Sequence, residues 1–133
     1  MRLYLDTSAL VKRYVDEEGS DAVRAAMAAA EVNSISWVGF VETIRAVGRT
    51  VGSSGVGWFE SERSTFDIVD FDRTLAGRAG RIGWSTGLRS LDAIHLAAAL
   101  SLSPRELVFA TWDVRLHRAA RAHGLRTLPS ALG

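Results

Sequence analysis

The sequence has 133 residues and a formal net charge of +1, and its length predicts a single domain spanning 1–133. It contains no cysteine, which excludes disulfides and thiolate chemistry and favours the reducing cytoplasm as the location. Hydrophobic residues make up 47% of the chain, yet no apolar run has the length of a signal peptide or a membrane span. We therefore expect a globular protein that does not associate with membranes.

The basic residues are almost all arginines. Lys12 is the only lysine among the 16 Lys and Arg residues. The planar guanidinium group suits phosphate recognition. GC-rich coding also enriches arginine, and we favour this compositional explanation for most of these residues. The near-neutral net charge alone does not indicate a nucleic-acid-binding protein.

The first half of the chain predicts alternating strands and helices. In chain order these are a strand at Leu3–Leu5, a helix from about Ala9, a helix at Asp21–Ala30, a strand at Asn33–Ser36 and a helix at Val38–Val51. The glycines and serines of Gly48–Gly57 then indicate a flexible loop or hinge.

The second half continues the same alternation. The predicted elements are a short helix at Trp58–Phe66, a strand at Asp67–Phe71, a helix at Leu75–Gly87 capped by Asp72, a helix at Leu91–Leu102 ended by Ser103-Pro104, a strand at Leu107–Ala110, a helix at Val114–Ala122 and a strand at Arg126–Leu128. Strands that alternate with helices predict a three-layer α/β sandwich with a central, mainly parallel sheet.

Four acids lie in apolar or helix-forming sequence. Asp6 follows the first strand, Asp113 follows the strand at 107–110, and Glu42 and Asp92 belong to predicted helices. The carboxyl ends of parallel strands line the crevice where open α/β sheets bind ligands. Carboxylates that share a pocket raise one another's pKa, and burying them unpaired is costly. A divalent cation, Mg²⁺ or Mn²⁺, would balance their charge, so we expect a metal site.

Ordinary structural roles compete with this interpretation. Asp6 and Asp113 also stand where helix N-caps are expected, and Glu42 is equally compatible with a paired surface acid. His95 lies three residues after Asp92, and we expect it to be a buried, hydrogen-bonded structural histidine. His117 is expected on a helix surface.

The motifs around the acids resemble a known family. They are Asp6–Lys12 (DTSALVK), the isolated Glu42, Leu91–Ala97 (LDAIHLA) and Ala110–Leu116 (ATWDxxL). In this order they are similar to those of PIN domains, and more narrowly to the VapC-type toxin ribonucleases of bacterial type II toxin–antitoxin pairs. The resemblance covers essentially the whole chain. It implies a PIN-like fold and a Mg²⁺- or Mn²⁺-dependent endoribonuclease that hydrolyses RNA phosphodiester bonds through metal-activated water.

The resemblance also implies roles for individual residues. The catalytic and metal-binding acids would be Asp6, Glu42, Asp92 and Asp113. From their positions beside the motifs, we expect the hydroxyls of Ser8 and Thr111 to support these acids, unless they only cap a helix or strand end. Arg89 and Arg115 are the arginines nearest the motifs and are expected to contact phosphate.

The expected partners are an RNA substrate, a cognate antitoxin and a second copy of the chain in a homodimer. We expect the antitoxin to bind across the groove beside the Glu42 helix and the segment Gly48–Phe66. Trp58 and Phe59 would otherwise expose apolar surface there.

Three other classes of protein were considered. A haloacid-dehalogenase phosphatase needs a second Asp two residues after the first, and Ser8 stands at that position. A receiver domain needs further acids adjacent to Asp6, which the sequence lacks. A catalytically silent PIN-like module, which would only bind nucleic acid or an antitoxin, remains the alternative, although all four acids are present.

Overall fold

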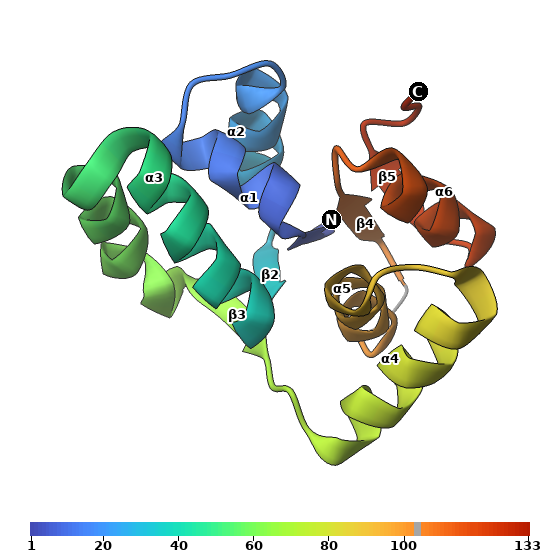
Figure 1. The fold of residues 1–133 in the computed structure, drawn as a ribbon. Helices are drawn as coiled ribbons and strands as arrows, with labels where there is room; N and C mark the ends of the chain where they lie inside the picture. The colour runs from blue at the N-terminus through green and yellow to red at the C-terminus, as the bar shows by residue number, and fades with distance from the viewer. Residues whose placement is uncertain (103–104) are drawn as a thin grey trace.

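Five parallel strands form the centre of the molecule in a computed structural model that describes residues 1–102 and 105–133. The strand order across the sheet is β3-β2-β1-β4-β5, and every strand pair is parallel. In chain order the elements are β1 (Arg2–Leu5), α1 (Thr7–Tyr14), α2 (Ser20–Ala29), β2 (Val32–Ser36), α3 (Trp37–Ser61), a 3₁₀ turn (Arg63–Thr65), β3 (Phe66–Val69), α4 (Arg73–Thr86), α5 (Ser90–Leu100), β4 (Leu107–Ala110), α6 (Val114–Ala122) and β5 (Arg126–Leu128). Figure 1 shows this arrangement, which confirms the predicted fold class.

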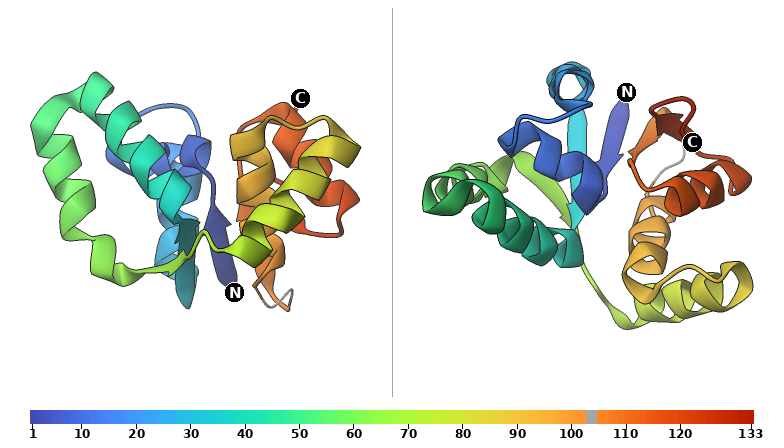
Figure 2. Two further views of the ribbon diagram at one scale, coloured as in Figure 1. Left: turned by 60° about the horizontal axis from the view of Figure 1, so that its bottom comes forward. Right: turned by 45° about the horizontal axis from the view of Figure 1, so that its top comes forward.

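Helices cover both faces of the sheet. Side chains alternate between the two faces of a strand, and β1 shows this directly. Leu3 and Leu5 pack into a core cluster with α1, α2 and α3, whereas Tyr4 packs into a second cluster with α4, α5 and α6. Figure 2 shows the two groups of helices on either side of the strands. Since all three residues are at most 1% exposed, β1 is buried on both faces, as the apolar run predicted.

The glycine-rich stretch, predicted to be a flexible loop or hinge, is not a loop, but it does contain a sharp break in the helix. It is helical, and α3 continues through it to Ser61 with one break at Gly52. Gly52 has φ 74° and ψ −162°, a conformation that only glycine adopts readily. At this residue α3 folds back on itself (Figure 1). A Cβ on Gly55 would come within 2.3 Å of a Val51 side-chain carbon, so the returning segment packs too closely for a larger residue.

Three further expectations need correction. The third strand begins at Phe66 and ends at Val69, earlier than predicted, because a 3₁₀ turn replaces the second half of the expected helix. Phe59 is fully buried, not exposed for a partner. His117 is also buried, not on the helix surface as expected, and the Pro129 carbonyl oxygen lies 2.8 Å from its Nε2 atom. The predicted helix stop at Ser103-Pro104 lies outside the described residues.

No helix in the described part of the chain is both long enough and apolar enough to cross a membrane. The longest, α3, has a polar and glycine-rich sequence.

Candidate active site

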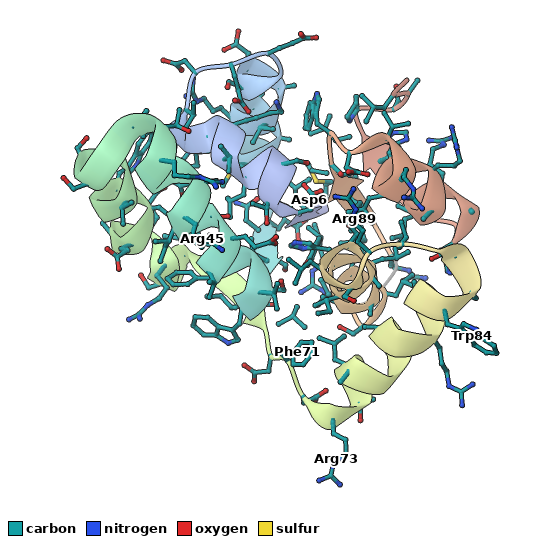
Figure 3. The ribbon with its side chains drawn as sticks, viewed as in Figure 1. Asp6, Arg45, Phe71, Arg73, Trp84 and Arg89 are labelled. Atoms are coloured by element: carbon teal, nitrogen blue, oxygen red, sulfur yellow. The ribbon has the colours of Figure 1, made fainter. Side chains whose placement is uncertain are left out.

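Strand register brings the first acid to the centre of the sheet edge. Leu5 of β1 pairs with Ala110 of β4, so Asp6 and Thr111 are the next residues on adjacent parallel strands. The Asp6 amide donates to the Ala110 carbonyl oxygen over 3.1 Å, which extends the pairing by one residue. Figure 3 places Asp6 near the centre of the molecule. The carboxyl end of the sheet therefore presents a carboxylate, as expected for a ligand site in an α/β fold.

Three hydrogen bonds hold the Asp6 carboxylate. Its Oδ1 atom accepts from the Ser8 hydroxyl at 2.7 Å and from the Ala9 amide at 2.9 Å. Its Oδ2 atom accepts from the Thr111 hydroxyl at 2.6 Å. Burial raises the pKa of Asp6, and these hydrogen bonds and His95 offset only part of the effect. Asp6 thus caps α1 and is also a desolvated, rigidly oriented acid.

Ser8 and Thr111 support more than Asp6. The Ser8 hydroxyl accepts a hydrogen bond from the Trp112 amide at 2.9 Å. The Thr111 hydroxyl accepts one from the Asp113 amide at 3.0 Å. Both hydroxyls therefore tie β1 to the segment that follows β4, and they fix the positions of two acids relative to each other.

Glu42 belongs to a second hydrogen-bonded group. Its Oε1 atom accepts from the Thr7 hydroxyl at 2.7 Å and lies 2.9 Å from Nε2 of His95. On the other side of the ring, Nδ1 of His95 lies 2.9 Å from the Tyr4 hydroxyl. Because a carboxylate only accepts, we assign the His95 proton to Nε2 and let Nδ1 accept from Tyr4. His95 is 2% exposed, so the expectation of a buried, hydrogen-bonded histidine is confirmed.

This group lowers the pKa of Glu42. Partial burial acts in the opposite direction, but the hydrogen bonds from His95 and Thr7 together outweigh it. The hydrogen bonds therefore favour the ionised form of Glu42. Asp6 behaves in the opposite way, because burial raises its pKa and disfavours its ionised form.

Asp92 differs from the other three acids because its side chain makes no hydrogen bond within the described residues. It lies in the first turn of α5 and is partly buried. Burial raises its pKa, and Asp113, Asp6 and Glu42 raise it further, against an opposing effect of His95. Asp113 caps α6 by accepting the Leu116 amide at 2.8 Å. The structure thus brings the four acids within electrostatic reach of one another.

The two arginines are not part of this group. Both are exposed, and neither forms an ion pair with the acids in the described residues. Arg89 stands at the N-cap of α5 without a capping bond from its side chain. Arg115 donates to the Gly87 carbonyl oxygen at 2.9 Å.

The acids form an open cluster. Within residues 1–102 and 105–133, no three His, Asp or Glu side chains are grouped closely enough to enclose one metal ion. Mg²⁺ usually binds through one or two carboxylates and keeps several water molecules. Burial raises the pKa of Asp92, and Asp113, Asp6 and Glu42 raise it further against an opposing effect of His95, so a nearby cation would stabilise the ionised form of Asp92. A hydrated divalent cation therefore fits this arrangement.

Tyr4 and Thr7 were missed at the sequence level. Thr7 directly follows Asp6 in the first motif, but its hydroxyl reaches Glu42, which is 35 residues away in the chain. Tyr4 is a core residue of β1, and only the fold shows that its hydroxyl meets His95. The one available signal was a tyrosine inside an otherwise aliphatic strand, because a buried hydroxyl requires a partner.

Replacing Tyr4 with Phe tests the importance of this buried chain. The variant leaves Nδ1 of His95 without its partner, so we expect a loss of about 1–3 kcal/mol in the free energy of unfolding. Chemical denaturation measures this loss. Tyr14→Phe is a matched control, because it removes a more exposed hydroxyl that donates to Glu62 at 2.7 Å. An equal or smaller loss for Tyr4→Phe would contradict the assignment.

Comparison with known proteins agrees with this fold. A model of the PIN domain family matches residues 3–122. Ribonuclease VapC47 of Mycobacterium tuberculosis is 37% identical over 134 residues, covering 94% of each chain. Ribonuclease VapC45 of the same organism is 32% identical over 139 residues, covering 98% of this chain and 96% of the relative.

Solved structures share the fold at lower identity. The crystal structure of M. tuberculosis VapC20, described as a toxin that cleaves the sarcin–ricin loop, has a TM-score of 0.72 at 15% identity and covers 88% of this chain and 94% of that one. A DNA-bound VapBC structure from Salmonella typhimurium has a TM-score of 0.68 at 19% identity and covers 96% of both chains. The parallel sheet with its cluster of acids is thus that of a PIN domain. The chain belongs to the PIN-domain family, in its VapC group.

Proposed function

We propose that this chain is a Mg²⁺- or Mn²⁺-dependent endoribonuclease that acts as the toxin of a toxin–antitoxin pair. The observation that carries the proposal is the convergence of Asp6, Glu42, Asp92 and Asp113 at the carboxyl edge of the sheet. Its relatives of similar length are ribonucleases by name. All four acids are present, which argues against a silent binding module.

The residues of the site have two roles, to bind the cation and to hold its ligands in position. Asp92 and Asp6 would hold the cation most directly, with Glu42 and Asp113 adding negative charge around it. When bound, the cation supplies positive charge for the phosphate and lowers the pKa of water. Ser8 and Thr111 keep Asp6 in one orientation, and His95 keeps Glu42 in place. Because these contacts exist without substrate, the acids need little rearrangement when RNA binds.

The proposed partners are an antitoxin and a second copy of the chain. Several structural neighbours are toxin–antitoxin complexes, including one from Klebsiella pneumoniae with a TM-score of 0.68. Trp58 is 42% exposed beside α1 and remains a candidate for antitoxin contact. Phe59 is not, because it is buried in the core.

Cleavage of an RNA panel by purified protein tests the proposed function. We expect cleavage in Mg²⁺ or Mn²⁺, none in EDTA, and none by the Asp6→Asn variant in either condition. Asn retains one oxygen that can cap α1, so the variant should fold. Undiminished cleavage in EDTA would contradict the metal requirement. RNA that is bound but never cleaved would indicate the silent module instead.

A further inference from the structure

A basic hollow lies beside α6, away from the core. It has a volume of about 300 Å³ and lies between α6 and the turn that follows α4. It is lined by two arginines, Arg115 and Arg118, and by His123, and none of the described residues that line it is acidic. We call this site the α6 hollow. Its remaining lining residues are Thr86, Leu88, Ala119 and Ala122.

Arg115 and His123 are each held in place by a backbone carbonyl oxygen. Arg115 donates to the Gly87 oxygen at 2.9 Å. A guanidinium has five N–H donors, so most of them remain for a ligand. His123 Nδ1 lies 2.8 Å from the Ala119 oxygen, which assigns a proton to Nδ1 and directs Nε2 away from the helix.

Arg118 has no such partner. In the described part of the chain its guanidinium makes no ion pair and no hydrogen bond, and the residue is exposed. The surrounding sequence is also one-sided in charge. After Asp113 the chain has arginines at 115, 118, 121 and 126 and no Asp or Glu. This local excess is hidden by the net charge of +1 for the whole protein.

The α6 hollow and the acid cluster share helix α6. Asp113 is the N-cap of α6, and Arg115 lies in the first turn after it. At a rise of about 1.5 Å per residue, Arg118 lies about 4.5 Å and His123 about 12 Å farther along the axis. Arg115, Arg118 and Ala122 recur at helical spacing on one face, which is the face that lines the hollow.

We propose that the α6 hollow binds backbone phosphates of the RNA strand that is cleaved at the acid cluster. This inference rests on the proposed function. Four clustered carboxylates repel an RNA strand, so a strand that reaches them needs cationic contacts close by. The guanidinium fork matches phosphate oxygens. RNA is favoured over an acidic protein segment because the helix that carries the two arginines is capped by Asp113, one of the four acids.

Salt-dependent RNA binding tests the inference. The probe is a short fluorescein-labelled single-stranded RNA, and anisotropy is measured in chelator so that no RNA is cleaved. Each lost phosphate contact should reduce the slope of log affinity against log salt by about 0.7 for single strands. We expect reductions of about 0.7 for Arg118→Gln and about 1.4 for Arg115→Gln/Arg118→Gln, with weaker binding for all sequences.

Arg118→Gln removes no contact within the described protein, so a folding defect does not limit the test. The matched control is Arg73→Gln/Arg78→Gln on α4, which loses the same charge at two exposed residues and should keep the wild-type slope. Figure 3 shows Arg73 far from Asp6. Wild-type affinity and slope in both α6 variants would overturn the inference.

Two other results of the binding experiment would have different meanings. If the α6 variants lose affinity for polyglutamate but keep their affinity for RNA, the hollow is a surface for an acidic protein and the inference is wrong. If wild-type protein binds RNA through these arginines but never cleaves it, the phosphate contacts of the hollow are retained, whereas the proposed ribonuclease function, and with it a cleaved strand, is overturned.

Discussion

Replacing Asp92 with Asn is expected to lower kcat/KM for RNA cleavage by more than about a hundredfold. Substituting groups that only support a metal ligand already costs about 10–100-fold, and Asp92 is expected to contact the cation directly. The change keeps the size of the side chain and removes no hydrogen bond seen in the described residues. Cleavage rates at saturating Mg²⁺ measure the effect, with circular dichroism as the check on folding.

Asp21→Asn is the matched control for this variant. Asp21 is also an acid in the first turn of a helix, but it is exposed on α2. We expect it to cleave like wild type. Near wild-type cleavage by Asp92→Asn would remove Asp92 from the catalytic group, and equal losses in both variants would point to a general charge effect.

Replacing Phe59 with Ala is expected to give the largest loss of stability, about 3–5 kcal/mol. Phe59 is fully buried, and its ring packs against Tyr14 at 5.1 Å, Phe40 at 5.1 Å and Phe66 at 6.1 Å between centroids. The substitution leaves a cavity where α1, α3 and β3 meet. Chemical denaturation measures the free energy of unfolding.

The adjacent residue provides the control. Trp58 is 42% exposed and contributes an edge-to-face contact with Tyr14 at 4.9 Å, so Trp58→Ala should cost about 1 kcal/mol. If both variants lose similar stability, Phe59 is not the core residue that the structure indicates. The pair therefore separates a core aromatic from a surface aromatic one position apart.

Most of the fold was predictable because local patterns agreed with the tertiary structure. The apolar run of β1 and the cap signals at Asp72 and Asp113 correspond to a buried strand and two side-chain caps. Parallel topology followed from the alternation of strands and helices. That alternation also predicted the position of Asp6 at the carboxyl edge of the sheet.

The failures arose where tertiary structure overrode composition. The glycines around Gly52 predicted a flexible loop or hinge, but both arms of α3 are helical, the break is confined to Gly52, and Gly55 packs closely against Val51. Phe59 directly follows Trp58 in sequence, and the way the second arm of α3 packs decides which of the two side chains enters the core. The sequence alone did not distinguish the buried aromatic residue from the exposed one.

The hydrogen bonds that hold the acids in place could not be predicted from the sequence. Tyr4, Thr7 and His95 come from three different elements and meet only after the sheet and α5 have packed. A hydrogen-bonded chain of this kind has no sequence period. The acids themselves were detectable because charge inside apolar sequence is rare, whereas hydroxyls in the same places are common.

Repulsion among the acids gives the most direct test of the account. The pKa of Asp92 is raised in the folded protein from its ordinary value of 3.8. The folded state therefore binds a proton at Asp92 more tightly than the unfolded state does. The stability that this proton contributes is present below pH 3.8 and is lost as the pH rises through the folded pKa. At neutral pH the ionised Asp92 consequently destabilises the metal-free protein.

The decisive measurement is a thermal melt of wild type and Asp92→Asn, each in chelator and in Mg²⁺ at neutral pH. In chelator, Asp92→Asn should melt no lower than wild type. Mg²⁺ should stabilise wild type, by about 2.7 kcal/mol at a hundredfold excess over Kd, and should stabilise the variant much less. If Asp92→Asn is strongly destabilised in chelator and both proteins respond equally to Mg²⁺, Asp92 is a structural residue and the acids do not share a metal.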